Sequence, residues 1–313
     1  MDMTELFRIA RYGLRGEFRH DEPMRRHTSW RAGGSADRAY FPVDLDDLCV
    51  FLGTIPRDEP VLLVGLGSNL LVRDGGFRGT VVFTSGALGT LELRDDGLVY
   101  AEVGVPSPKV SRFAALHDFE GAEFLSGIPG TVGGALAMNA GCFGSETWDR
   151  VARVLVVDRA GALRTRGPDD YVVGYRHCGL TPSAPRSGDD EWFAAAWFRF
   201  PRASGEASRI RIKEFLARRS ATQPLGQPNA GSVFRNPPGD HAARLIESCG
   251  LKGHRRGDAM VSEKHANFII NVGEARAADI ESLIREVRET VWRQCNVLLE
   301  PEVRIVGEPL LAA

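Results

Sequence analysis

Three short stretches carry polar side chains that folding alone would not require. One is Gly174-Tyr175-Arg176-His177-Cys178, and another runs from Gln223 to Pro237 around an apolar pair at 233–234. The third, Leu299-Glu300-Pro301-Glu302-Val303, places a carboxylate before the final strand. A single arginine or glutamate is by default a solvated surface charge. The density of polar groups around Gly231-Ser232 instead favours a site, because glycine lets another group approach the serine.

Basic residues gather in the last third of the chain. Most of them are expected to be solvated charges. Together they also suit a substrate with a diphosphate, because Lys and Arg bind phosphate oxygens through charge-assisted hydrogen bonds. They are Arg218, Arg219, Lys252, His254, Arg255, Arg256 and Lys264.

Two glycine-rich stretches are shaped for close approach to the backbone. Gly127 to Gly141 contains five glycines, and Val61 to Leu70 runs from a short apolar strand into a Gly-x-Gly-Ser-Asn turn. Glycines remove Cβ atoms, so N–H groups can line a concavity that holds an anion. A helix beginning near Thr131 would add unpaired N–H groups of its own. We therefore expect a diphosphate here, and we expect a valine at Gly133 to fill space that belongs to the ligand.

Neither glycine stretch matches a standard nucleotide motif. No Gly-Lys-Ser/Thr follows either one, and neither completes Gly-x-Gly-x-x-Gly before a helix. Either stretch alone is typical of a tight turn, but two of them flanking one strand-rich region favour a dinucleotide held by the backbone. The basic cluster then predicts a second ligand, so we expect a cofactor and a separate substrate. The motifs of serine and cysteine hydrolases are absent.

The composition indicates an ordinary globular chain. It has 313 residues, 43% hydrophobic and 26% charged, with a formal net charge of −2. This balance gives no general attraction to nucleic acid or to an anionic membrane. No run is long enough to span a membrane and the N-terminus lacks an apolar signal core, so we expect a cytoplasmic protein. The five cysteines are scattered without metal-ligand spacing, and we predict neither a metal nor a disulfide framework.

The elements that must position these stretches follow from hydrophobic periodicity. The pattern changes near 201–206 from mostly β to α/β. We expect helices over 44–52, 108–118, 208–219 and 280–291, another capped by Asp240 and ended by Gly250, and a short one within 1–26. We expect strands at 61–64, 70–72, 80–83, 98–102, 154–158, 192–200, 232–234, 268–270, 297–299 and 303–306, and a polar surface loop at 181–190.

Seven motifs, taken in order, carry a specific resemblance. They are His27–Gly34, Gly65–Leu70, Gly127–Gly141, Tyr175-Arg176, Gly231–Pro237, Val261–Asn271 and Pro301-Glu302-Val303. From about residue 27 to the final strand the chain resembles the UDP-N-acetylenolpyruvoylglucosamine reductase family, flavoenzymes of bacterial peptidoglycan precursor synthesis. The glycine stretches alone would support only the wider vanillyl-alcohol-oxidase-type FAD fold.

The resemblance implies an α+β protein in which a two-lobed FAD-binding domain of the vanillyl-alcohol-oxidase type precedes an α/β substrate-binding domain. It places lobe 1 at 1–86 with the C-terminal strand 302–313, lobe 2 at 87–206, and the substrate domain at 207–301. It implies non-covalent FAD, NADPH as co-substrate, and reduction of UDP-N-acetylglucosamine enolpyruvate to UDP-N-acetylmuramate. We expect a monomer.

The same resemblance assigns roles to residues. Hydride would pass from flavin N5 to the enolpyruvyl methylene carbon, with Ser232 as proton donor and with Arg176 and Glu302 beside the substrate carboxylate. The residues implied for FAD, chiefly its diphosphate, are Gly65, Gly67, Ser68, Asn69, Leu70, Gly127, Ile128, Pro129, Gly130, Thr131, Gly133, Gly134, Asn139, Ala140 and Gly141. Those implied for the substrate are Tyr175, Arg219, Gln223, Arg235, Asn236, Lys264 and His265.

The chain departs from the family pattern at three places. Cys178 stands where serine is usual, Arg235 stands where lysine is common, and the segment between Arg176 and Gln223 lacks the longer tyrosine-bearing substrate loop. Two other classes compete with the reductase. A flavin oxidase of the same wider fold often attaches FAD through His or Cys, and a non-catalytic nucleotide-binding protein should lack the trio of Arg176, Ser232 and Glu302.

Overall fold

The computed structural model describes residues 13–184 and 190–310. Residues 1–12 of the segment predicted to contain a short helix, and residues 185–189 of the predicted loop at 181–190, lie outside them. The chain forms two compact units. The first comprises residues 1–20, 38–65 and 79–216, and the second comprises 21–37, 66–78 and 217–313. Each unit therefore draws on segments that are far apart in the sequence.

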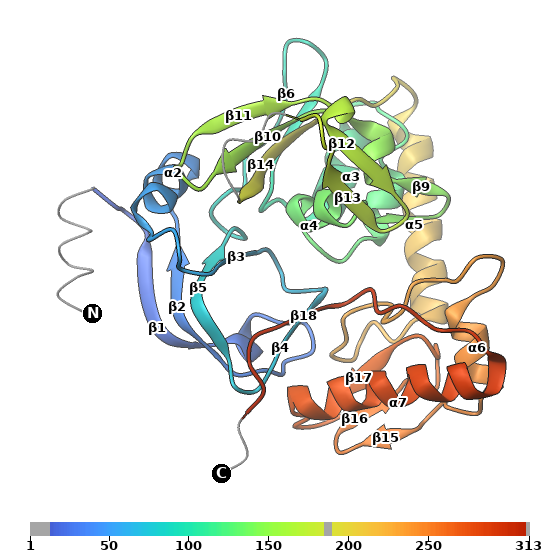
Figure 1. The fold of residues 1–313 in the computed structure, drawn as a ribbon. Helices are drawn as coiled ribbons and strands as arrows, with labels where there is room; N and C mark the ends of the chain where they lie inside the picture. Colours follow the sequence, from blue (N-terminus) through green and yellow to red (C-terminus); the bar gives the residue numbers. More distant parts are fainter. Residues whose placement is uncertain (1–12, 185–189, 311–313) are drawn as a thin grey trace. The chain divides into compact units, whose positions relative to one another are not determined.

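The first unit is built on a five-stranded sheet with the order β11-β10-β14-β7-β6 (Figure 1). Its strands are β6 (Leu91–Leu93), β7 (Val99–Glu102), β10 (Val151–Asp158), β11 (Leu163–Arg166) and β14 (Glu191–Phe198). Helices α2 (Leu45–Thr54), α3 (Ser107–Leu116) and α4 (Val132–Ala137) contribute apolar residues to the same core. The strands predicted at 98–102, 154–158 and 192–200 and the helices predicted at 44–52 and 108–118 are confirmed to within a few residues.

Two short hairpins and three 3-10 turns also belong to the first unit. The β12–β13 hairpin (Tyr171–Gly174 and His177–Leu180) and the β8–β9 hairpin (Gly141–Cys142 and Ser145–Glu146) are antiparallel. The 3-10 turns are η2 (Glu123–Gly127), η3 (Thr147–Arg150) and η4 (Pro168–Asp170). The sequence patterns did not predict either hairpin, because strands of two to four residues are too short to show a period of two.

A four-stranded sheet has the order β1-β2-β5-β3, and the division between the units runs through three of its strands. The strands are β1 (Glu17–Pro23), β2 (Ser35–Phe41), β3 (Val61–Val64) and β5 (Phe77–Phe83), and η1 (Met24–Arg26) follows β1. Within the first unit β3 pairs with β5 in parallel. Residues 17–23 form a strand, so the short helix predicted within 1–26 is not found in residues 13–26, and residues 1–12 lie outside the described part of the chain.

The second unit has a sheet of three antiparallel strands, β15 (Arg255–Arg256), β16 (Ala259–Val261) and β17 (Ile269–Asn271), and helices α6 (Ala242–Ser248) and α7 (Ala277–Cys295). Strand β4 (Leu70–Val72) pairs in parallel with β18 (Arg304–Val306). The apolar face of α7 enters its core, as the periodicity predicted. Helix α5 (Gly205–Thr222) has residues in both units.

Three local predictions for the second unit are wrong. Residues 232–234 and 297–299 are not strands, because only an isolated bridge joins Phe234 to Pro301. Asp240 does not cap α6. The amide of Ala242 instead donates to the Asn236 side chain at 3.1 Å, while Asp240 binds Arg244. Gly250, with φ of 70°, does follow the end of α6 as predicted. No described helix is long and apolar enough to cross a bilayer.

Candidate functional site

The two glycine stretches meet within the first unit. A Cβ atom added to Gly65 would clash with the side chain of Thr131. The backbone at the end of β3 is therefore in van der Waals contact with the loop that precedes α4. The close approach needs glycine, because any larger residue would separate the two segments.

Some of the amide groups expected to be free in the loop before α4 are already bonded within the protein. The amides of Val132 and Gly133 donate to the carbonyls of Val105 and Val103 at 2.9 and 3.0 Å, so they are not available to a ligand. Within residues 13–184 and 190–310, no protein acceptor is recorded for the amides of Gly130, Thr131 and Gly134. The predicted supply of free amides at the helix start is thus partly wrong, because two of them are used within the protein.

A side chain added at Gly133 would meet packed protein, whereas one added at Gly134 would not. A Cβ on Gly133 would lie 3.0 Å from Cβ of Val103, whereas a Cβ on Gly134 would have no heavy atom within 4 Å. Gly134 is also exposed. Open space therefore lies over Gly134 and not over Gly133. The expectation for Gly133 is wrong in this respect, because that position is closed by packing.

The second unit holds the rest of the Gly-x-Gly-Ser-Asn turn. Gly67 has φ of 58°, and a Cβ there would clash with the carbonyl oxygen of His27. No acceptor among the described residues is recorded for the four successive amides from Leu66 to Asn69. Successive free amides in a turn form an anion-binding concavity. Both loops therefore fit a cofactor whose diphosphate is held by backbone groups.

Arg176 lies at the turn of the β12–β13 hairpin in the first unit. Its φ is 52°, in the left-handed region that non-glycine residues rarely adopt. Its Nη2 atom donates to the carbonyl of Gly141 at 2.9 Å, and its guanidinium carbon lies 5.0 Å from the ring centroid of Tyr175. The structure therefore joins the predicted Arg176 and Tyr175 to the second glycine stretch, and Tyr175 is 46% exposed at the turn.

Ser232 and Glu302 are brought together in the second unit by backbone pairing. The amide of Glu302 donates to the carbonyl of Val233 at 2.7 Å, and the amide of Arg235 donates to the carbonyl of Glu300 at 2.9 Å. The side-chain amide of Asn69 donates to the Glu302 carbonyl at 3.1 Å. Glu302 thus contacts the predicted cofactor turn, and the residue after Ser232 pairs with Glu302. Both side chains are partly exposed.

Tyr175 lies in the first unit, and the other six predicted substrate residues lie in the second. Arg219 donates to Gln223 at 3.0 Å, and Nζ of Lys264 donates to the carbonyl of Ser220 at 2.6 Å, so three of these residues meet at the end of α5. Arg235 and Asn236 follow Ser232 in the chain, and the Asn236 side chain is used to bind the start of α6.

His265 lies beside Phe268, with ring centroids 4.7 Å apart. Burial lowers the pKa of His265, so its imidazole is neutral near pH 7. No partner of its buried Nδ1 atom is found among residues 13–184 and 190–310. A neutral imidazole with an unsatisfied nitrogen is suited to a hydrogen bond with a ligand, but the atom is covered in this structure.

Sequence reasoning missed one residue that holds the Ser232 segment. Asn267 is 4% exposed, its carbonyl accepts from the Val233 amide, and its side chain makes two hydrogen bonds with the backbone of Phe234 at 3.0 and 2.8 Å. These bonds replace the strand pairing that was predicted at 232–234. Asn267 lies inside the motif Val261–Asn271, but nothing local reveals which backbone it contacts.

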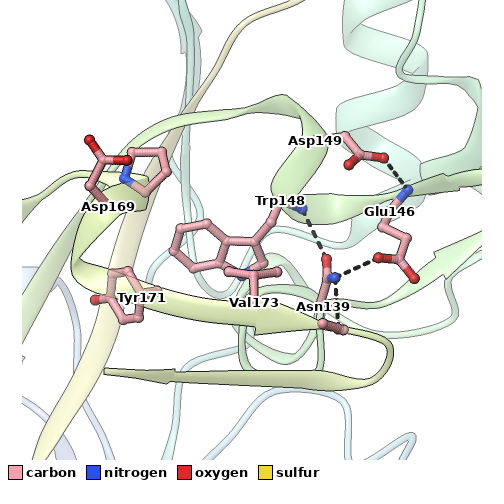
Figure 2. Close-up of a pocket in the computed structure, with 9 residues that line it drawn as sticks. Asn139, Glu146, Trp148, Asp149, Asp169, Tyr171 and Val173 are labelled. Carbon is pink, nitrogen blue, oxygen red and sulfur yellow. Dashed lines mark hydrogen bonds between the residues drawn. The ribbon is translucent and has the colours of Figure 1, made fainter. Parts of the chain in front are cut away.

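A cavity of about 600 Å³ lies beside the β12–β13 hairpin (Figure 2). Of the predicted site residues, Asn139 is among those that line it, and none of the predicted catalytic residues is. Its lining residues are Asn139, Glu146, Trp148, Asp149, Pro168, Asp169, Tyr171, Val173 and Gly174. The cavity touches the stretch Gly127–Gly141 through Asn139, and the rest of its lining is largely acidic and aromatic.

Cys178 lies on β13 with its side chain against the core of the first unit. Burial raises the pKa of the thiol to about 12, so it stays neutral and unreactive at pH 7–8. We expect Cys178→Ser to retain turnover and to lower the free energy of unfolding by no more than about 1–3 kcal/mol, the cost of a buried hydroxyl. Steady-state kinetics and urea unfolding measure the two quantities. Complete loss of turnover in a folded variant would give the thiol a catalytic role.

The fold and the two backbone loops define an FAD-binding flavoprotein. Residues 37–166 match the family described as an FAD binding domain, and residues 223–306 match the family described as UDP-N-acetylenolpyruvoylglucosamine reductase, C-terminal domain. The chain belongs to the UDP-N-acetylenolpyruvoylglucosamine reductase family.

Curated relatives and a solved structure support this membership over nearly the full length. The chain is 58% identical to UDP-N-acetylenolpyruvoylglucosamine reductase of Nitrosospira multiformis, over 99% of this chain and 94% of the relative. It is 58% identical to the reductase of Methylococcus capsulatus, over 94% of each. The crystal structure of the Thermus caldophilus reductase matches with a TM-score of 0.77 and 32% identity, over 93% of this chain and 98% of that one. The predicted fold class is confirmed.

Proposed function

We propose that the protein catalyses the NADPH-dependent reduction of UDP-N-acetylglucosamine enolpyruvate to UDP-N-acetylmuramate, a step of peptidoglycan precursor synthesis, with FAD as cofactor. The observation that carries the proposal is the backbone pairing of Glu302 with Val233, the residue after Ser232, beside Asn69. The family relationship supplies the substrate. We place the enzyme in the cytoplasm, where its nucleotide-sugar substrate and NADPH are available. We also propose that it is a monomer.

Each of the three predicted catalytic residues has its own role in the reaction. Bound FAD supplies the hydride for the enolpyruvyl methylene carbon. Negative charge then develops on the neighbouring carbon and its carboxylate, and the cationic Arg176 offsets it electrostatically. Glu302, if protonated, donates a hydrogen bond to the same group. Ser232 gives its proton to the enolate-like carbon, which is basic enough to accept it from an alcohol.

We assign the cofactor to the free amides of Leu66–Asn69 and of Gly130, Thr131 and Gly134, within the loops Gly65–Leu70 and Gly127–Gly141. We assign the nucleotide part of the substrate to Arg219, Gln223 and Lys264, with Arg235 and His265 on the neighbouring segments. The hydrogen bonds of Arg219 to Gln223 and of Lys264 to Ser220 support a shared cationic surface at the end of α5.

The experiment that tests the proposal is an anaerobic two-step titration. NADPH should bleach the flavin, and the enolpyruvyl sugar should then restore the oxidised spectrum and yield a product heavier by two hydrogens. Reoxidation by oxygen alone, with the sugar unchanged, would support the flavin oxidase instead. A chain that binds the sugar nucleotide without any flavin reduction would be a binding protein.

Purified protein is expected to be yellow with non-covalent FAD, because the cradle consists of backbone amides and no attachment residue is evident. Acid precipitation should leave the flavin in the supernatant, where its absorbance measures the stoichiometry. Flavin that precipitates with the protein would indicate the covalent attachment common among oxidases. A colourless protein that FAD cannot reconstitute would contradict the cofactor assignment.

A further inference from the structure

Asn139 uses all of its side-chain hydrogen-bonding groups within the first unit. Its Nδ2 group donates to Oε2 of Glu146 at 2.7 Å and to the carbonyl of Gly174 at 3.0 Å, while its Oδ1 atom accepts from the amide of Trp148 at 3.1 Å (Figure 2). Asn139 is 1% exposed. With both hydrogens donated in the interior, the carboxamide has no donor left for a ligand. The family resemblance assigns Asn139 to the cofactor without naming an atom, and this side chain is engaged inside the fold.

The Gly174 carbonyl that Asn139 binds belongs to the last residue of β12, directly before the turn Tyr175-Arg176. Arg176 has φ of 52°. A non-glycine residue is strained in this conformation and keeps it only where its surroundings fix it. The surroundings here include a second link, because the Arg176 guanidinium donates to the Gly141 carbonyl at 2.9 Å and to the Asn139 carbonyl at 3.5 Å.

The segment from Asn139 to Gly141 therefore holds the hairpin turn from two sides. The Asn139 side chain holds the backbone before the turn, and two backbone carbonyls of the segment hold the arginine head group. Asn139 itself has φ of 41°, a conformation that asparagine adopts more readily than most residues. The position of Arg176 is thus set by the same loop that follows α4.

We propose that Asn139 is a positioning residue for Arg176, acting through the Gly174 carbonyl and not through the cofactor or the substrate. The proposal rests on the proposed function, in which Arg176 acts only on the charge that develops during reduction of the substrate. It predicts that a substitution of Asn139 slows only one of the two half-reactions. Reduction of the flavin by NADPH should proceed, and transfer to the enolpyruvyl sugar should slow.

Asn139→Asp is the first test variant. Aspartate keeps the shape, tolerates the left-handed backbone and can still accept from the Trp148 amide, but it replaces both donated hydrogen bonds by contacts between oxygen atoms. We expect reoxidation by the substrate to slow about 10- to 100-fold, since a misplacement of about 1 Å has effects of that order. Reduction by NADPH should stay within about twofold of wild type, and FAD should remain bound. Glu146→Gln is the matched control, because its retained carbonyl oxygen still accepts from Asn139.

A double-mutant cycle with Arg176→Lys separates positioning from general structural damage. If Asn139 acts through Arg176, Asn139→Asp should have little further effect on reoxidation in the Arg176→Lys background. Additive losses would overturn the proposal. Hydrogen exchange of the amides at 171–180 in FAD-free protein gives a readout that is independent of activity, and it should be faster in Asn139→Asp than in Glu146→Gln.

The outcomes distinguish the two levels of inference. If the wild-type enzyme is not reoxidised by the enolpyruvyl sugar, the proposed function fails, while hydrogen exchange still tests the hold on the hairpin. If the wild type is active and Asn139→Asp matches it in both half-reactions, the positioning role is wrong. Should Asn139→Asp fail to fold, Asn139→Gly carries the same test at a low backbone cost. Failure of both variants to fold would show a purely structural residue.

Discussion

Replacement of Ser232 by alanine should leave the reduction of FAD by NADPH close to the wild-type rate and slow the following step severely. Only the transfer to the enolpyruvyl sugar requires a proton from the protein. Loss of a placed general acid costs about 10²–10⁴-fold. Stopped-flow absorbance should therefore show rapid bleaching and then reduced flavin that persists in the presence of substrate.

The substrate should still bind to this variant, because Arg176, Glu302 and the basic groups at the end of α5 are unchanged. Ser282→Ala is a matched control, since this α7 serine accepts only a weak hydrogen bond at 3.4 Å from the exposed Arg285. Equal slowing of both half-reactions in Ser232→Ala would make Ser232 a positioning or folding residue. No slowing of either would assign the proton to another group.

A second large effect is expected when a side chain is added at Gly134, on the open side of the cofactor loop. Gly134→Val places a branched group in space that contains no protein atom within 4 Å of its Cβ. Valine is at least as good a helix former as glycine, so stability should not fall. Forcing extra methyl groups into space filled by a ligand costs about 1–3 kcal/mol, which is about 5- to 150-fold in Kd for FAD. Fluorescence titration of FAD-free protein measures the constant.

Gly133→Val is the informative comparison. Its Cβ would lie 3.0 Å from Cβ of Val103, so the expected effect is a lower free energy of unfolding, measured by urea denaturation. Wild-type affinity for FAD in a folded Gly134→Val protein would show that the diphosphate does not lie over this residue. A Gly133→Val protein of wild-type stability would contradict the packing at Val103.

The structure also shows long-range contacts that complete the second unit. The first two amides of α7, at Ala277 and Ala278, donate to the carboxylate of Asp74 at 2.9 and 2.8 Å. The indole of Trp30 donates to the Ile269 carbonyl at 2.7 Å, and the side chain of Asn271 returns a bond to the Trp30 carbonyl at 3.0 Å. Each of these bonds satisfies a buried or terminal backbone group with a partner about 200 residues away in the chain. No local pattern specifies such a pair.

Much of the protein was readable from its sequence because the signals are local. Glycines in the loop at Gly65–Asn69 mark a backbone that must turn and approach another chain segment, and Gly67 has the positive φ that this requires. Apolar periodicity located α2, α3 and α7, whose buried faces repeat every three to four residues. The motifs around Arg176, Ser232 and Glu302 identified the family, which the relatives confirm.

What only the tertiary structure decided depends on side-chain direction and on partners distant in sequence. Adjacent glycines at 133 and 134 look equivalent in the sequence, yet one faces Val103 and the other faces open space, because successive positions on a helix are rotated by about 100°. The segment at 232–234 has the composition of a strand, but Asn267 and the residues around Glu302 satisfy its backbone without a ladder. Asn139 belongs to a motif assigned to the cofactor, and only the tertiary structure shows that its side chain is buried with three internal hydrogen bonds.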